Sequence, residues 1–522
     1  MNLTLIKSFH CKLLGIGLLL VYAGPLQAAS PRLIVILVGD QVRADYMERY
    51  HDDLAPDGLR RFRDEGTYFA QAARDDAVEK TSPGHVLIGS GLYARQSGIV
   101  NNEWYDAVSS RSVSAAEILP GGRRTQLRWF AGTSFARRLH AAKPESRVVS
   151  ISLKDRGALL LTGPDQDEAY WWDHDSQGYR AYGQSPTWLQ DFNRRQADYV
   201  LTHDRWEPLV PVYGDKAAAF AATAVILADH VKPEHDLGKN FPHEIRSLDA
   251  LMSTPYSDDL SEELAEKAIT QWKLGKNPKG VDVLTVSFSA VDLVGHQFGP
   301  DSQEIMDAFL RLDKDVAHLM RFVDREVGEN VVWVFSSDHG VTPFPEIPLS
   351  QGFKAGRVPF DKAVLPHGEW IAATAAPFIY LENNHKEDAD RLKKDLQALE
   401  GVQAVYTSKE IMTGHAPKEI QRSFYRPKPG EPSRSGDLWV ILKPKYIFSD
   451  APYGTTHGQP TADDQRVPLG FYGAGIGRVL REDVVSPVRI APTLLHLLKI
   501  PAPDLSKPLN VFNYSESKTP TR

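Results

Sequence analysis

Three predominantly apolar runs, each followed within a few residues by an aspartate, constrain the fold of this chain more than any other feature. They span residues 33–39, 281–288 and 331–335, and a fourth apolar run covers 147–151. A strand with one face in water alternates apolar and polar residues, whereas an unbroken apolar run is typical of a strand buried on both faces of a parallel sheet. The sequence therefore predicts a sheet that helices cover on both sides.

Helical patterns lie between and after these strands. They cover residues 57–65, 216–230, 261–272, 302–327 and 487–498. Strands that alternate with helices in this way predict a doubly wound, mostly parallel α/β sheet flanked by helices. Ligands of such folds bind at the edge where the strands end. Polar residues that follow the four strands fall at that edge, namely Asp40, Lys154, Asp292 and Asp338.

The length of 522 residues allows one enlarged catalytic domain with insertions, or two to three smaller units. We interpret residues 355–445 as a small α+β insertion, because short strand patterns flank a charged helical pattern there. Two stretches, 104–145 and parts of 158–275, are interpreted as loop-rich decoration. The predicted organisation is a signal peptide at 1–28, a core at 29–354, the insertion at 355–445, the rest of the core at 446–515 and a tail at 516–522.

The first 28 residues predict a secretory signal peptide. Two lysines precede an apolar stretch at 13–23, and small residues follow at Ala28 and Ala29. The stretch is shorter than the ~20 residues that span a bilayer, so we expect a periplasmic protein with no membrane segment after cleavage. Cys11 is the only cysteine and is lost with this peptide. Any metal must then be held by oxygen and nitrogen ligands.

Aspartates and histidines recur in short motifs at the predicted strand ends. In Asp292-x-x-x-His296, four residues separate a carboxylate from an imidazole, a spacing that brings both to one face of a helical turn. Each motif alone is ordinary, because an Asp after a strand often caps a helix. Together they supply more ligands than one tetrahedral zinc accepts, which predicts two metal ions. The predicted ligands are Asp40, Asp292, His296, Asp338, His339 and His457.

A hydroxyl-rich turn at 81–85 precedes an apolar segment. A Thr or Ser before Pro is a good helix N-cap, and the same position offers an anion the positive end of a helix. Near a metal, Thr81 can also act as a nucleophile, and Ser82 is the rival hydroxyl. We expect His85 to pack rather than to bind metal. Taken alone, Asn102, Lys154 and Arg156 are ordinary surface polar residues.

In their order along the chain, these motifs resemble the alkaline phosphatase superfamily and, within it, the periplasmic monomeric PafA-type phosphatases. The resemblance runs from about residue 32 to residue 498. Several elements are shared with nucleotide pyrophosphatase/phosphodiesterases, whereas Lys154-Asp-Arg156 is typical of the monoesterase branch. The matching elements are Gly-Asp40, Thr81-x-x-Gly-His, Gly-Ile-x-x-Asn102, Lys154-Asp-Arg156-Gly, Ser-Ala-x-Asp292-x-x-Gly-His296, Ser-Asp338-His339-Gly and Thr-His457-Gly.

The resemblance implies a role for each matching residue. It implies one zinc ion held by Asp292, His296 and His457, and a second held by Asp40, Asp338, His339 and the Thr81 oxygen. It also implies that Thr81 is the nucleophile and that Asn102, Lys154 and Arg156 bind the phosphoryl oxygens. The hydroxyl of Ser82, next to Thr81, is not part of the family pattern, so the choice between the two hydroxyls stays open.

These observations predict a periplasmic, metal-dependent phosphate monoester hydrolase that is a monomer and forms a phosphothreonine intermediate. Two Zn²⁺, three carboxylates and an alkoxide sum to zero charge, so Lys154 and Arg156 leave two positive charges to match a monoester dianion. We expect activity that rises with pH and is lost in chelator. The alternatives are a phosphodiesterase or nucleotide pyrophosphatase on the same core and a periplasmic binding protein. Loss of Cys11 excludes a cysteine-derived sulfatase, and the formal charge of −7 argues against a nucleic-acid-binding surface.

Overall fold

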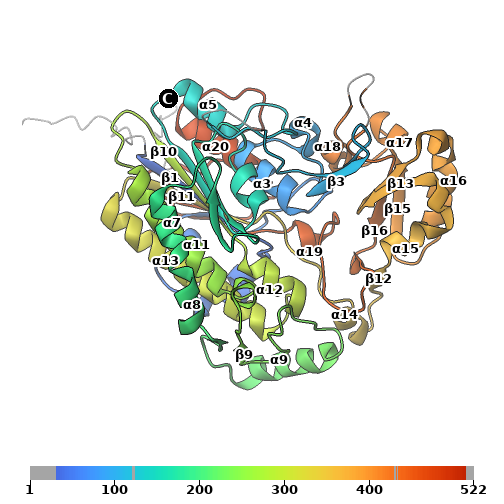
Figure 1. Cartoon of the computed structure of the whole chain (residues 1–522), viewed down its shortest axis with the longest axis horizontal. Coiled ribbons are helices and arrows are strands. Elements are labelled where there is room, and N and C mark those ends of the chain that lie inside the picture. Colours follow the sequence, from blue (N-terminus) through green and yellow to red (C-terminus); the bar gives the residue numbers. More distant parts are fainter. Residues whose placement is uncertain (1–30, 120–123, 428–430, 432, 513–522) are drawn as a thin grey trace, which may run out of the picture.

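A nine-stranded sheet forms the centre of the computed structural model, which describes residues 31–119, 124–427, 431 and 433–512 (Figure 1). The strand order is β19-β2-β18-β11-β1-β10-β5-β6-β7. Its central strands are parallel, as the doubly wound α/β fold requires, so that prediction is confirmed. The predicted signal peptide and tail lie outside the described residues. The parallel strands are β11 (Val331–Ser336), β1 (Leu33–Gly39), β10 (Asp282–Phe288), β5 (Val148–Ser152) and β6 (Glu168–Asp173).

Antiparallel pairings occur towards both edges of the sheet. On one side, β18 (Leu469–Gly473) runs antiparallel to β11 and to β2 (Thr67–Phe69), and β19 (Val479–Arg481) lies beyond β2. On the other side, β7 (Gly178–Ala181) runs antiparallel to β6. The sheet is therefore mostly, but not entirely, parallel.

Helices cover both faces of the sheet, and β1 shows why an unbroken apolar run is needed. Successive side chains of a strand point to opposite faces. Leu33, Val35 and Leu37 pack with α11 (Tyr256–Trp272) and α13 (Gln303–Glu326). The intervening residues Ile34, Ile36 and Val38 pack in a second core cluster. That second cluster includes α3 (Thr81–Ser90), α5 (Phe135–Ala142) and α20 (Ile490–Leu497) (Figure 1).

The expectation of loop-rich decoration is wrong for residues 168–181. These residues form β6 and β7, and β6 extends the main sheet beside β5. Tyr170 and Trp172 are buried in the same core cluster as β1, and Trp171 packs on the opposite side. Aromatic side chains fill this edge of the core. The strand was hard to predict because its apolar run, residues 169–172, has only four residues and lies between Glu168 and Asp173.

A second, smaller sheet lies within residues 355–445. Its antiparallel order is β13-β14-β16-β15, and Leu392 and Leu396 of α16 (Ala389–Gln397) pack in its apolar cluster. Phe378 and Trp439 instead join a cluster that includes Val86 of α3, so the small sheet packs against the α3 side of the core. Its strands are β13 (Ile371–Ala375), β14 (Phe378–Leu381), β16 (Leu438–Leu442) and β15 (Val402–Thr407).

Nowhere in the described ranges is a helix both long and apolar enough to cross a bilayer.

The remaining helices and strands complete the described chain. These elements are α1 (Tyr46–Arg49), η1 (His51–Asp53), α2 (Arg60–Asp64), α4 (Ala94–Ser97), β3 (Glu103–Asp106), β4 (Arg111–Ser114), α6 (Asp155–Leu160), α7 (Thr187–Arg194), α8 (Gln196–Thr202), β8 (Arg205–Trp206), α9 (Gly214–Leu227), β9 (His243–Glu244), α10 (Leu248–Met252), α12 (Ala290–Phe298), α14 (Glu346–Ser350), β12 (Gly356–Val358), α15 (Phe360–Val364), η2 (Leu365–Trp370), η3 (Asn383–Asp388), α17 (Ser408–Met412), α18 (Lys418–Ser423), β17 (Tyr446–Phe448), α19 (Ala462–Gln465) and η4 (Pro487–Arg489).

Candidate active site

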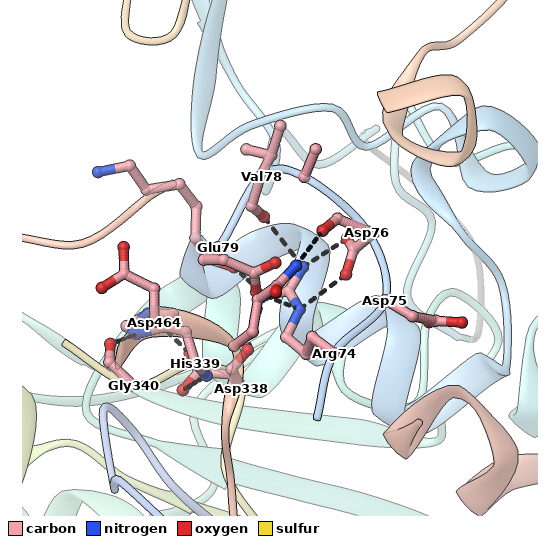
Figure 2. Close-up of polar contacts among 12 residues, drawn as sticks. Arg74, Asp75, Asp76, Val78, Glu79, Asp338, His339, Gly340 and Asp464 are labelled. Carbon is pink, nitrogen blue, oxygen red and sulfur yellow. Dashed lines mark hydrogen bonds and ion pairs between the residues drawn. The ribbon is translucent and has the colours of Figure 1, made fainter. Parts of the chain in front are cut away.

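The predicted acid and imidazole side chains meet at the edge where the parallel strands end. Asp40 follows β1, and Asp338 and His339 follow β11 in the turn that Figure 2 shows. Asp292 and His296 lie on α12, which begins just after β10. The last of the set, His457, comes from the loop before α19. Four segments far apart in the sequence thus supply the cluster.

Asp292, His296 and His457 form the first group of possible metal ligands. One ligand atom from each lies within 4.8 Å of the others. Asp292 Oδ1 is 3.2 Å from His296 Nε2, because four residues of helix place both side chains on one face, and 3.7 Å from His457 Nε2. This is the same set that the resemblance assigns to one zinc ion.

A second group, formed by Asp40, Asp292 and His339, has the same compactness. His339 Nε2 lies 3.6 Å from Asp40 Oδ1, 3.3 Å from Asp338 Oδ2 and 3.5 Å from Thr81 Oγ1. The residues assigned to the second zinc ion by resemblance therefore surround one imidazole nitrogen. Asp292 lies close to both groups, a proximity that the sequence assignment did not include.

All three imidazoles are oriented by backbone carbonyl groups. A carbonyl only accepts hydrogen bonds, so each Nδ1 must donate, and in a neutral ring the lone pair is then on Nε2, which faces the centre of the cluster. Sequence reasoning missed these partners because a backbone carbonyl has no residue-type signature. The bonds run from His296 Nδ1 to Thr455 O (2.7 Å), from His339 Nδ1 to Gly340 O (3.0 Å) and from His457 Nδ1 to Glu79 O (2.6 Å).

The charge of the cluster fits divalent cations. Asp40, Asp292 and Asp338 are at most 4% exposed, and Lys154 pairs with the first two at 2.6 and 2.5 Å. One oxygen of Asp40 and one of Asp338 are buried without a hydrogen bond in the described structure. Buried carboxylates that outnumber their cations are costly unless further positive charge binds. Three carboxylates with three imidazoles form a donor set that suits zinc.

The pKa values of the cluster follow from burial and from mutual repulsion. Burial, together with the charges of Asp292 and Asp338, raises the pKa of Asp40 well above its ordinary value. For Asp292, burial is outweighed by Lys154 and His296, so its pKa lies well below that value. Burial lowers the pKa of His339 to about 4 and that of His457 well below 6.5. Both imidazoles are therefore neutral near pH 7, as metal ligation requires.

Thr81 is the first residue of α3 and not its cap. Lys80 occupies the N-cap position in an extended conformation, and its side chain makes no capping bond. The expectation that Thr81 or Ser82 caps α3 is therefore wrong, because the chain is already helical at Thr81. Thr81 Oγ1 lies near His339 Nε2, whereas Ser82 Oγ is buried without a hydrogen-bond partner.

The three predicted phosphoryl-binding residues have different surroundings. Asn102 Oδ1 accepts a 2.8 Å hydrogen bond from the Ser82 backbone, which places it beside the start of α3. Lys154 contacts Asp40 and Asp292, as described above. Arg156 lies in the first turn of α6 with its side chain one-third exposed, and its guanidinium is 3.8 Å from Asp155.

Gln41 is a site residue that sequence reasoning missed. Its Nε2 donates to Asp292 Oδ1 at 2.7 Å, and its backbone N–H donates to Asp338 Oδ1 at 3.2 Å. The residue has φ of 65°, an uncommon conformation for a side chain other than glycine, and nothing in the sequence signals it. His85 bonds to Thr81 O and Ser287 Oγ and lies 3.3 Å from Asp338 Oδ2, which agrees with a packing role.

Comparison with known proteins gives consistent relatives. Residues 33–463 match the family described as type I phosphodiesterase / nucleotide pyrophosphatase. Alkaline phosphatase PafA of Elizabethkingia meningoseptica is 28% identical over 518 residues, covering 92% of this chain and 94% of that protein. Alkaline phosphatase PhoK of a Sphingomonas species is 29% identical over 529 residues, covering 92% and 90%. The crystal structure of wild-type alkaline phosphatase PafA is similar with a TM-score of 0.80 at 26% identity, covering 92% of this chain and 98% of that one.

Proposed function

The chain belongs to the type I phosphodiesterase / nucleotide pyrophosphatase family and is similar to alkaline phosphatases over more than nine-tenths of its length, and we propose from this premise that it is an alkaline phosphatase, which hydrolyses phosphate monoesters through Thr81 at a two-zinc site. One observation carries the proposal. Three imidazole Nε2 atoms, each fixed by a carbonyl at Nδ1, and three buried carboxylates gather beside the first residue of a helix.

Each ligand has a place in this proposal. One zinc ion would be held by Asp292, His296 and His457. The other would be held by Asp40, Asp338, His339 and the oxygen of Thr81. Bound zinc lowers the pKa of coordinated hydroxyl groups and water and stabilises negative charge on oxygen.

The residues of the chain then perform a double displacement. Thr81 Oγ, deprotonated, forms a bond to phosphorus while the bond from phosphorus to the ester oxygen breaks, which leaves an alcohol and a phosphothreonine. Water next attacks that phosphorus, releasing phosphate and returning Thr81. Asn102, Lys154 and Arg156 bind the phosphoryl oxygens, where negative charge is concentrated during transfer.

Charge favours a monoester over a diester. A monoester dianion carries two negative charges, which Lys154 and Arg156 match, and a diester has only one. The competing function is a phosphodiesterase on the same core, which the family description favours. Rates on a mono-aryl phosphate and a bis-aryl phosphate decide between them, and a faster diester rate would refute the monoesterase proposal.

The nucleophile is tested by trapping the intermediate. Protein is mixed with a ³²P-labelled monoester, quenched in acid and digested, and the labelled peptide is identified. We expect label on Thr81, none in Thr81→Ala, and wild-type labelling in Ser82→Ala. Label on Ser82, or full turnover by Thr81→Ala, contradicts the assignment of the nucleophile.

The proposed location is the periplasm, reached through the signal peptide at 1–28. In a Gram-negative host we expect phosphatase activity in the osmotic-shock fraction and a mature N-terminus near Ala29. Activity that stays with the cytoplasmic fraction argues against export. Gel filtration of the same material tests the proposed monomer.

A further inference from the structure

Arg74 lies fully buried in the segment that leads to Thr81, and its guanidinium joins parts of the chain that are far apart (Figure 2). Nε and Nη2 bind the two oxygens of Asp76 at 2.9 and 2.6 Å, and Nε forms an ion pair with Glu79 at 2.6 Å. Nη2 also donates to Val78 O at 2.9 Å. The guanidinium therefore fixes the shape of residues 74–79.

A further bond links this segment to the turn after β11. Arg74 Nη1 donates a 2.7 Å hydrogen bond to the backbone carbonyl of Asp338. Gly84 of α3 packs against the same hydrogen bond. A Cβ atom at Gly84 would lie 2.5 Å from the Asp338 carbonyl oxygen and 2.9 Å from Arg74 Nη1. The first turn of α3, the guanidinium and the Asp338 turn are thus packed without spare room.

The same segment holds His457. Glu79, which Arg74 binds through its side chain, accepts the Nδ1–H of His457 at its backbone carbonyl. A shift of residues 78–80 would therefore move three groups together. They are the Thr81 hydroxyl, the ring of His457 and the backbone carbonyl of Asp338. These groups come from three separate parts of the sequence.

We propose that Arg74 is a positioning residue for hydrolysis, because it sets the nucleophile segment against the Asp338 turn and the carbonyl that orients His457. This inference rests on the proposed function. Arg74 makes no hydrogen bond or ion pair with Asn102, Lys154 or Arg156, so it acts on the nucleophile and the metal ligands and not on the substrate-binding side chains. Groups that orient metal ligands in this way commonly change metal affinity or activity about 10–100-fold when they are lost.

The test compares Arg74→Lys with a matched control, Arg311→Lys. Lysine at position 74 can still pair with Asp76, but it cannot also reach Val78 and Asp338, because it lacks the guanidinium fork. Arg311 has the same kind of contacts remote from the site, with a 2.7 Å bond to the buried Asp307 and a 2.9 Å bond to Glu207 O. Both variants lose a guanidinium fork that binds a buried carboxylate, so a general loss of stability appears in both.

Four quantities are measured for each variant: the melting temperature, kcat and KM on a mono-aryl phosphate, and zinc affinity by competition with a chelating dye. We expect Arg74→Lys to lower kcat and zinc affinity by about 10–100-fold while KM changes less than about twofold. Arg311→Lys should lower the melting temperature but leave kcat, KM and zinc affinity near wild type when they are measured below that temperature. Wild-type kcat and zinc affinity in Arg74→Lys would overturn the proposal, as would equal losses in the two variants.

Asp76→Asn is the second variant, to be measured if Arg74→Lys does not fold. It keeps the guanidinium and its bond to Asp338, but it weakens the ion pair between Arg74 and position 76 that holds residues 74–79 in place. We expect about a tenfold loss of zinc affinity, and unchanged affinity overturns the inference. The zinc measurement also separates the two proposals. A wild-type protein that fails to hydrolyse monoesters refutes the proposed function, whereas zinc binding by the variants still decides the role of Arg74.

Discussion

Lys154 Nζ donates to Asp40 Oδ2 at 2.6 Å across the end of the sheet, and it makes a second bond to Asp292 at 2.5 Å. The lysine thus bridges a carboxylate that follows β1 and a carboxylate on α12. Burial lowers the pKa of Lys154, but Asp292 and Asp40 outweigh that effect and raise it above its ordinary value. The two carboxylates therefore favour the cationic form of Lys154.

Substitution of Lys154 should affect monoesters more than diesters. We expect Lys154→Ala and Arg156→Ala each to lower kcat/KM for a mono-aryl phosphate by about 10²–10³, the usual cost of losing a fixed donor to developing negative charge. The diester rate should fall less, because its single negative charge depends less on two cations. Steady-state rates on both esters, with zinc content measured in parallel, check this.

The matched control for those substitutions is Arg180→Ala, on β7, whose side chain is about half exposed. It should leave both rates unchanged. An equal fall for mono- and diesters in Lys154→Ala and Arg156→Ala would contradict the charge-matching argument. Low zinc content in Lys154→Ala alone would instead trace its loss to the bonds with Asp40 and Asp292.

Asp258 supplies the cap that α12 lacks. Its carboxylate accepts from the backbone N–H groups of Ser289 and Ala290 at 2.8 and 3.2 Å, while the Ser289 side chain makes no capping bond. We expect Asp258→Ala to lower the free energy of unfolding by about 2–3 kcal/mol, because two buried N–H groups lose their acceptor. Zinc affinity should fall as well, since α12 carries Asp292 and His296.

Ser247→Ala is the control for Asp258→Ala. Ser247 caps α10 through its side chain, and α10 carries no site residue. Its loss should cost about 1 kcal/mol with zinc affinity and kcat unaltered. If Asp258→Ala destabilises the protein while zinc affinity stays at the wild-type value, the link from this cap to the metal ligands is wrong.

Removal of metal should abolish activity and lower stability. We expect dialysis against a chelator to inactivate the enzyme, and two equivalents of zinc to restore it. Zinc at about 1,000 times its dissociation constant stabilises the folded state by about 4 kcal/mol per site, so the melting temperature should rise with zinc concentration. Asn102→Ala removes no proposed metal ligand. It should bind two equivalents of zinc and show the same rise in melting temperature with zinc, while its rate of hydrolysis is lower. Activity that persists in excess chelator excludes the metal proposal.

The local features of this fold can be predicted from the sequence because they depend on neighbouring residues. The run at 33–39 alternates its side chains between two buried faces, so continuous hydrophobicity marks β1 directly. The four-residue spacing in Asp292-x-x-x-His296 gives one helical face wherever the segment is helical. The meeting of Asp40, Asp292 and Asp338 followed from one rule, since parallel strands end at the same edge of the sheet.

Features that depend on backbone conformation or on distant partners could not be predicted from the sequence. The positive φ that aims Gln41 at Asp292, and the carbonyls that orient the imidazoles, have no residue-type signal. Nothing in the sequence singles out Arg74, because its bond to Asp338 joins positions 264 residues apart. The start of α3 at Thr81 depends on the extended conformation of Lys80, which propensity does not determine.

Asp313 gives a pH-dependent test of stability remote from the site. Its buried carboxylate accepts from the backbone N–H groups of Ala55 and Leu59 at 2.6 and 2.7 Å. Burial nevertheless raises the pKa of Asp313 to about 6, above the 3.8 of an unfolded chain. Below about pH 4 the group is protonated in both states and costs nothing. Between pH 4 and 6 folding takes up a proton, so stability falls as pH rises, and above pH 6 the cost reaches about 3 kcal/mol at ~1.4 kcal/mol per pKa unit.

Asp313→Asn is neutral at every pH, so it should gain stability relative to wild type by about 3 kcal/mol between pH 4 and pH 7. It also leaves one of the two N–H groups without an acceptor, a cost that does not change with pH. Urea unfolding of both proteins at several pH values, in chelator so that zinc binding does not contribute, measures the difference. Asp52→Asn, whose side chain is 99% exposed, is the control and should track wild type. A difference between wild type and Asp313→Asn that stays constant from pH 4 to pH 7 would show that burial does not raise the pKa of this group.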